Sequence, residues 1–283
     1  MTEEWRIYYT EKELAEIQRI ELELLDVLSE VCKKLDIKFF LYGGSLLGAV
    51  KYGGFVPWDD DFDIAMMRND YEKLIKEAPA LIPEGYELQE PRLNKRTPYP
   101  YTKLRKTDTV MVEYKCRNIK INHGVYFDIY PIDNLPDDDN ELLQNQQKLQ
   151  KLVLILQQRQ TASLSAPING KRDIIRQIYY FVKFLLARLF PHASLVNKMN
   201  SIMTKYNKIN SKRQGNYFFP EPVNYFDGIY PPIEVDFEGR KMLIPQGYKI
   251  NLKNRYGDIA QDPPEGKKVG HKPYILKLNL EEE

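Results

Sequence analysis

Two aspartates that alternate with apolar residues constrain this chain more than any other feature. In the segment Asp61-Phe62-Asp63-Ile64 the acids occupy every second position. In an extended strand this spacing places Asp61 and Asp63 on one face and directs Phe62 and Ile64 into a core on the other face. Two neighbouring carboxylates repel each other unless a cation lies between them. The pattern therefore predicts a buried-edge strand that carries a metal site.

A glycine-rich turn precedes this strand. Gly43, Gly44 and Ser45 follow residues 37–42, which are predicted to form a strand, and Ser45 is predicted to cap a short helix that ends at Val50. Backbone N–H groups and a hydroxyl at such a turn allow a phosphate to approach closely. Hard divalent cations such as Mg²⁺ accompany phosphates. We therefore expect Gly44 and Ser45 to bind a phosphate group beside the metal.

Two other interpretations of the acidic run compete with a metal site. Four aspartates within residues 59–63 can form a solvated loop, but the interleaved Phe62 and Ile64 disfavour it. Asp59, Asp61 and Asp63 have the initial spacing of an EF-hand calcium loop. That loop requires Gly at its sixth position and Glu at its twelfth. This chain has Ile64 and Asp70 there, so we reject the EF-hand.

Charged residues on two later strands extend the predicted site. Residues 124–130 form a predicted strand in which Asp128 is the one acid among apolar residues. Burying a lone carboxylate is costly unless it is paired or bound to metal, so Asp128 is either a third metal ligand or part of a structural ion pair. Residues 101–105 alternate and place Lys103 and Arg105 on one face. Both are candidates to clamp phosphates, with solvated surface positions as the alternative.

Composition excludes several classes of protein. The chain has 283 residues, of which 43% are hydrophobic and 29% charged, and a formal net charge of +1. This is enough for one large domain or a domain with an insertion, and it gives no argument for nucleic-acid binding. Cys32 and Cys116 offer no disulfide framework. Without a signal-peptide pattern or an apolar run of about 20 residues, we expect a cytoplasmic protein.

Helical periodicity appears over residues 11–35, 69–77, 141–160 and 174–190. The last of these combines a broad apolar face with basic residues. Between Ile174 and Pro220 the chain has eight Lys or Arg residues and no Asp or Glu. Such a helix either lies on an anionic membrane surface or covers the core, and the sequence leaves both interpretations open.

Three units are predicted along the chain. Residues 1–139 form a catalytic core, and residues 140–215 form a basic helical insertion that binds a membrane surface or an acceptor. Residues 216–283, with a hairpin turn near residues 237–241, complete the catalytic unit.

Several motifs, in order along the chain, resemble the LicD family of phosphotransferases, to which the fukutin-type ribitol-phosphate transferases are related. The most specific is Pro57-Trp58-Asp59-Asp60-Asp61, within a matching stretch at residues 54–66. The others lie at residues 42–50, 70–72, 124–133, 237–239, 256–258 and 263–264 and at His271. Ser45 stands where Thr is common, residues 51–53 stand where a more basic stretch is usual, and residues 140–215 contain no matching motif.

This resemblance implies an α+β fold, a nucleotidyltransferase-like mixed sheet flanked by helices, here with a helical insertion. It implies metal-dependent transfer of phosphocholine, or a similar phospho-alcohol, from a CDP-alcohol such as CDP-choline. The acceptor would be a sugar hydroxyl of a glycan precursor such as teichoic acid or lipopolysaccharide, and CMP would be released. His271 becomes a candidate phosphate partner or acid. Peripheral association with the inner face of the cytoplasmic membrane is compatible with such an acceptor.

The expected mechanism rests on the carboxylates. Asp61, Asp63 and Asp128 would hold one or two Mg²⁺ (or Mn²⁺) ions that bridge the donor diphosphate. Asp128, or with less support Asp59, would accept the hydroxyl proton, while Asp59 and Asp60 would otherwise orient the metal ligands.

Three other functions remain open. One is a glycosyltransferase that uses a nucleotide sugar. Another is a nucleotidyltransferase that acts on a small phosphorylated substrate. The third is a binding module without turnover.

Overall fold

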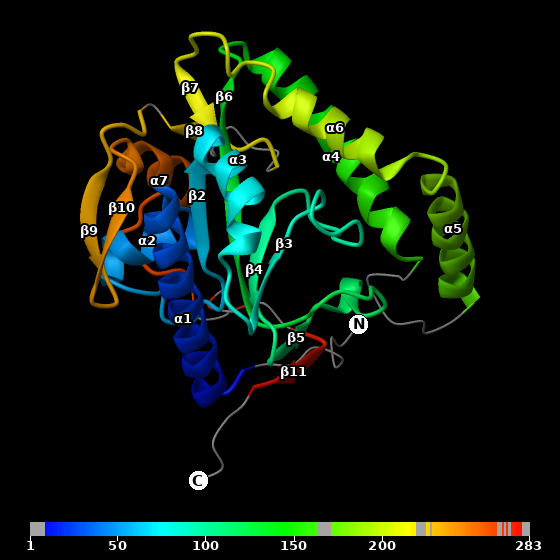
Figure 1. Cartoon of the computed structure of the whole chain (residues 1–283), viewed down its shortest axis with the longest axis horizontal. Coiled ribbons are helices and arrows are strands. Elements are labelled where there is room, and N and C mark those ends of the chain that lie inside the picture. Colours follow the sequence, from blue (N-terminus) through cyan, green and yellow to red (C-terminus); the bar gives the residue numbers. More distant parts are fainter. Residues whose placement is uncertain are drawn as a thin grey trace.

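A mixed β-sheet flanked by helices forms the centre of the molecule (Figure 1). The computed structural model describes residues 9–162, 171–218, 225, 226, 228–264, 268, 270 and 273–278. The main path of the sheet has the strand order β1-β2-β6-β4-β3. Strands β2 and β6 are parallel, whereas β1–β2, β6–β4 and β4–β3 are antiparallel. The α+β class and the mixed sheet predicted from the sequence are confirmed.

The elements of the first half of the chain are these: α1 (Glu11–Leu35), β1 (Phe40–Leu41), α2 (Gly43–Tyr52), β2 (Asp63–Met67), α3 (Arg68–Glu77), β3 (Tyr86–Gln89), β4 (Thr102–Lys106), β5 (Val110–Val112) and β6 (Tyr126–Leu135), with 3-10 turns at Ala78–Ala80 and Tyr114–Cys116. Those of the second half are α4 (Asp139–Gln160), α5 (Lys171–Ala187), α6 (His192–Met203), β7 (Arg213–Gly215), β8 (Tyr225–Phe226), β9 (Ile233–Phe237), β10 (Arg240–Ile244), α7 (Tyr248–Tyr256) and β11 (Ile275–Lys277).

Helix α1 covers the apolar side of the sheet. It begins after Thr10, whose side chain accepts a hydrogen bond from the Glu13 N–H in a capping box. Its buried stripe, which includes Ile17 and Leu24, joins Phe62 and Phe127 in the main core. Because successive strand residues point to opposite faces, burying Phe62 and Phe127 leaves the neighbouring acids on the other face.

Helices α4, α5 and α6 form a separate layer at one end of the sheet. Helices α4 and α6 pack through their own apolar cluster, which includes Leu149, Leu156 and Met199. In Figure 1, α5 lies at the outer edge of this layer, on the side far from the β9–β10 hairpin. Strand β7, which follows α6, pairs with the end of β6. The predicted helical insertion is therefore present, while the division of the chain into three units stays a prediction.

Two local predictions were wrong. The strand predicted at residues 37–42 is reduced to β1, two residues long. Helix α2 begins at Gly43 with Tyr42 as its N-cap, so Ser45 lies inside the first turn and does not cap it. The predicted turn at residues 237–241 is confirmed as the connection between β9 and β10. Within the part of the chain that the structure describes, every helix is too short or too polar to cross a bilayer.

Candidate active site

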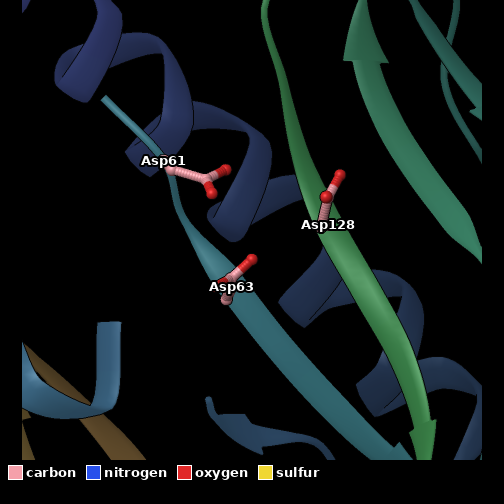
Figure 2. A group of neighbouring side chains, drawn as sticks. All are labelled: Asp61, Asp63 and Asp128. Atoms are coloured by element: carbon pink, nitrogen blue, oxygen red, sulfur yellow. The ribbon is translucent and has the colours of Figure 1, made fainter. Parts of the chain in front are cut away.

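Three aspartates meet where β2 and β6 run side by side. Asp63 is the first residue of β2 and is paired in register with Asp128 of the parallel strand β6, and Asp61 lies two residues before Asp63. Carboxylate oxygens of the three residues all lie within 4.8 Å of one another. Figure 2 shows Asp61 and Asp63 along one strand segment, beside the strand that carries Asp128. We call Asp61, Asp63 and Asp128 the acidic triad.

The acidic triad fits a divalent cation. Asp63 is buried, and its Oδ1 has no hydrogen-bond partner among the described residues. Burial raises the pKa of Asp63 well above its usual range, and repulsion from Asp61 and Asp128 adds to the effect, with Arg255 opposing it. A buried carboxylate oxygen without a partner is costly unless a cation or water satisfies it. An all-oxygen ligand set suits Mg²⁺ or Mn²⁺.

Lys103 contacts the triad directly. Register places it opposite Asp128 on the neighbouring strand β4, and its Nζ donates a hydrogen bond to Asp128 Oδ1 over 2.5 Å. Tyr130 Oη donates to the other oxygen, Oδ2, over 3.0 Å. Burial lowers the pKa of Lys103 to about 8, although the Asp128 carboxylate opposes this shift. Asp128 therefore belongs to a buried ion pair as well as to the triad, and its role as a metal ligand stays a prediction.

Arg105 lies on the same face as Lys103 but is held by protein groups. Its Nε donates to Gln89 Oε1 over 2.7 Å, and one of its Nη atoms donates to the main-chain oxygen of Gly124 over 2.6 Å. The side chains of Lys103 and Arg105 are 2% and 1% exposed, so the alternative of solvated surface positions is wrong for both. The contacts of Arg105 favour a structural role over the phosphate clamp expected from the sequence.

The glycine turn packs closely against two of the acids. A Cβ on Gly43, which has φ +53°, would lie 2.3 Å from Asp63 Oδ2, and a Cβ on Gly44 would lie 2.7 Å from Asp59 Oδ2. The N-terminal turn of α2, where backbone N–H groups and the helix dipole favour negative charge, therefore abuts both carboxylates. Ser45 is buried, and its Oγ accepts the Asp63 N–H over 2.7 Å, which fixes the start of β2.

The two remaining acids of the run lie in different surroundings. Asp59 is half-buried, and its main-chain oxygen accepts a hydrogen bond from Gln18 Nε2 over 2.9 Å. Asp60 is buried and accepts the hydroxyl of Tyr9 over 2.5 Å. Their predicted role in orienting the metal ligands stays a prediction. His271 lies outside the described residues.

Sequence reasoning missed two charged residues beside the acids. Arg255 of α7 lies against the rings of Tyr42 and Tyr256, at 6.0 and 5.6 Å from their centroids, and is close enough to Asp63 to oppose the rise in its pKa. Glu21 of α1 is fully buried, and neither of its carboxylate oxygens has a hydrogen-bond partner within the described ranges. An acid on the apolar stripe of the predicted helix 11–35 was the available signal for Glu21. Arg255 gave none, since only the packing of α7 against α2 and β8 brings it there.

Two cavities lie near the site. The first, of about 380 Å³, is lined by Gly44 and Asp59 together with the aromatic rings of Tyr52, Trp58 and Tyr256. The second, of about 370 Å³, lies between α4 and the loop before β4, with Tyr99, Tyr101, Leu149, Val153 and Phe218 in its wall. The centroid of the Tyr101 ring lies 4.6 Å from that of Tyr130, whose hydroxyl donates a hydrogen bond to Asp128. The first cavity therefore touches the acidic run at Asp59, whereas Tyr101 and Tyr130 stand between the second cavity and Asp128.

Residues 36–168 match the family described as LicD/FKTN/FKRP, nucleotidyltransferase domain. All three members of the acidic triad lie inside this match. The chain carries a LicD-family nucleotidyltransferase domain. The family resemblance inferred from the motifs is thereby confirmed.

Similar proteins extend this result beyond the domain. The chain is 25% identical over 275 residues to the lipopolysaccharide cholinephosphotransferase LicD of Haemophilus influenzae, an alignment that covers 93% of this chain and 98% of the relative. It is also 38% identical over 64 residues to an uncharacterised protein of Rickettsia prowazekii, over 23% of this chain and 24% of that protein. Together with the family match, the first alignment identifies the chain as an enzyme of the phosphotransferase class.

Proposed function

We propose that this LicD-family enzyme transfers phosphocholine, or a similar phospho-alcohol, from a CDP-alcohol such as CDP-choline to a sugar hydroxyl. The acceptor is a precursor of a cell-surface glycan such as lipopolysaccharide or teichoic acid, and CMP is released on the cytoplasmic side of the membrane. The observation that carries the proposal is the acidic triad, whose three carboxylates lie within 4.8 Å of one another. The named activity of the Haemophilus relative supports the choice of phosphocholine.

Asp61, Asp63 and Asp128 would hold Mg²⁺ or Mn²⁺. A cation bound there would neutralise charge on the donor diphosphate, the main requirement of phosphoryl-type transfer. The N-terminal turn of α2 at Gly44 and the guanidinium of Arg255 add positive potential on the same side. Lys103, buried against Asp128, keeps this carboxylate oriented toward the other two acids.

The cavity beside Gly44 suits the donor. Its aromatic wall, with Tyr52 and Trp58 in edge contact at 6.1 Å between centroids, offers ring faces to a quaternary ammonium or to a cytosine base. We assign the donor to this cavity and the sugar acceptor to the cavity beside Tyr101. The reacting phosphorus would then lie at the triad.

In the transfer, the acceptor hydroxyl oxygen forms a bond to the choline-side phosphorus, and the bond from that phosphorus to the bridging oxygen breaks. The bridging oxygen leaves with CMP, and the hydroxyl proton passes to a carboxylate. Asp128 and Asp59 are the two candidates. Both oxygens of Asp128 already accept hydrogen bonds, whereas Asp59 borders the donor cavity.

The test is CMP release from CDP-choline in the presence of Mg²⁺ and a glycan acceptor. We expect Asp61→Asn and Asp63→Asn to lower turnover by at least about 100-fold, because each removes a ligand charge from the triad. Asp36→Asn is the matched control, since Asp36 is an exposed residue in the left-handed conformation that Asn tolerates. Folded triad variants with wild-type turnover would remove these residues from the site.

A nucleotidyltransferase that uses a nucleoside triphosphate is the second candidate, because the matching family is described by that domain. Product analysis separates the two, since such an enzyme releases pyrophosphate and the proposed transferase releases CMP. A panel of CDP-alcohols in the same assay identifies the donor alcohol.

A further inference from the structure

Helix α5 exposes an unusually apolar surface. Ten large apolar side chains in and just after this helix are between 46% and 76% exposed. They are Ile174, Ile175, Ile178, Tyr179, Phe181, Val182, Leu185, Leu186, Leu189 and Phe190. We call this set the α5 apolar face. At roughly 150 Å² for a large side chain, it presents on the order of 800 Å², more than the largest apolar patch of a typical monomer.

The α5 apolar face is one continuous side of the helix. At about 100° per residue, its ten members fall in an arc of roughly 180°, and no charged residue interrupts it. The opposite side, with the buried Ala187, packs against α4. Arg159 of α4 donates to the main-chain oxygens of Ala187 and Arg188, each over 3.1 Å, and to that of Phe190. These bonds to the C-terminal carbonyls hold α5 with its apolar side outward.

This arrangement decides between the two interpretations that the sequence left open. A helix that covered the core would bury its broad apolar face, but among the described side chains of α5 only Ala187 is buried. Figure 1 shows the reason, since α4 and α6 lie between α5 and the sheet. The core-covering interpretation of residues 174–190 is therefore wrong.

Charge at the edges of the face indicates what covers it. Lys183 and Arg176 border the arc on one side and Arg188 borders it on the other. The Lys183 ammonium lies 4.4 Å from the Tyr179 ring centroid and the Arg188 guanidinium 4.5 Å from that of Phe184, so each charged group lies over an aromatic ring of the helix. Long basic side chains at such edges can reach anionic headgroups while their stems stay on apolar surface.

We propose that α5 lies on an anionic bilayer surface, with its apolar face in the headgroup and acyl boundary. The absence of Asp and Glu from residues 174–220, against eight Lys and Arg, complements an anionic surface over the whole neighbourhood of the helix. A second copy of the chain fits less well. Face-to-face pairing of two α5 helices would bring the basic edges of both copies together, where like charges repel.

With α5 on the bilayer, a lipid-linked acceptor would also have a short path to the acidic triad, an argument that rests on the proposed function. A cavity of about 260 Å³ lies beneath α5, with Tyr180, Leu154 and Tyr99 in its wall. It shares Tyr99 and Leu154 with the acceptor cavity that reaches Tyr101. A sugar carried on a lipid could therefore approach the acidic triad along α4 from the side on which α5 meets the bilayer.

The experiment measures binding of the full chain to vesicles, and it does not depend on catalysis. The probes are vesicles of phosphatidylglycerol with phosphatidylethanolamine and, for comparison, vesicles of phosphatidylcholine alone, assayed by co-sedimentation at low salt. We expect binding to the anionic vesicles. Because each basic residue contributes about a fivefold effect, Arg176→Glu with Lys183→Glu should lower the partition coefficient at least about 30-fold. Ile175→Ser with Ile178→Ser should lower it at least about tenfold.

Matched controls distinguish the contribution of α5 from that of overall charge or surface hydrophobicity. Lys33→Glu with Lys34→Glu reverses two exposed lysines on α1, and Ile209→Ser with Ile233→Ser removes two exposed isoleucines elsewhere. Both controls should bind like the wild type. Three results would each overturn the proposal. The wild type could fail to bind either kind of vesicle, or the control variants could lose as much vesicle binding as the α5 variants. The third is self-association of the wild type that Ile175→Ser with Ile178→Ser abolishes while vesicle binding stays unchanged. A failure of CMP release alone would leave it standing and count against the proposed function.

Discussion

The buried ion pair between Lys103 and Asp128 gives the sharpest test of the site. The side chains of these residues are 2% and 6% exposed, so solvent does not screen the 2.5 Å contact. In Lys103→Met the chain length is kept but the positive charge is lost, and Asp128 stays buried beside Asp61 and Asp63. Removing one partner of a buried pair costs about 3–5 kcal/mol of stability. An exposed pair would cost at most about 1 kcal/mol.

Urea unfolding of the metal-free protein at pH 7 measures this loss, with Lys34→Met on the surface of α1 as the control. The loss should shrink with added Mg²⁺, which replaces the missing cation. Adding Asp128→Asn to Lys103→Met should restore part of the stability, with a coupling energy of at least about 2 kcal/mol. A loss below about 1 kcal/mol that is insensitive to Mg²⁺ would refute this account of the site.

Three further predictions test the surroundings of the triad. Burial, with repulsion from the acidic run, raises the pKa of Glu21 well above its usual range, so the folded state binds more protons than the unfolded state and stability falls as pH rises from about 4. Glu21→Gln should therefore raise the free energy of unfolding at pH 8 by at least about 1 kcal/mol and have little effect at pH 4. In the same urea titrations, Glu30→Gln at an exposed position of α1 should be neutral at both pH values. Gly43→Ala should lower Mg²⁺ affinity in calorimetry by at least about tenfold, because the added Cβ meets Asp63. Gly53 also has a positive φ but has open space around it, so Gly53→Ala should cost only about 1 kcal/mol of stability. Equal Mg²⁺ binding by the two variants would contradict the close approach of Gly43 to Asp63. Mg²⁺ at about 100 times its dissociation constant should stabilise the wild type by about 2.7 kcal/mol in thermal unfolding, and an equal gain in Asp63→Asn would place the ion elsewhere.

The α5 proposal changes how the helical layer is understood. Helix α4 lies inside the family match and contributes to both the acceptor cavity and the support of α5. If α5 meets the bilayer, this layer links the membrane to the active site and sets the side from which a lipid-linked sugar arrives. Variation in such a layer would then alter acceptor choice without touching the acidic triad.

Local patterns determined much of this protein. Apolar residues at helical spacing, with a capping Thr10 and basic residues at the far end, define α1 at its observed bounds, Glu11–Leu35. Alternation places Asp61 and Asp63 on one face, and the single acid among apolar residues marks Asp128. These signals are readable because backbone periodicity alone sets which side chains share a face. The composition of residues 174–220 likewise identifies a basic, acid-free region.

Tertiary structure decided how those faces meet. The parallel register of β2 and β6 places Asp63 beside Asp128, and the register of β4 places Lys103 against the same carboxylate. Residue spacing within one segment cannot determine such contacts between segments. The packing of α2 against β2 turns Ser45 from a predicted cap into an acceptor for the Asp63 N–H. Whether α5 is inside or outside depended on α4 and α6 already occupying the space next to the sheet, because burial is a property of neighbours rather than of sequence.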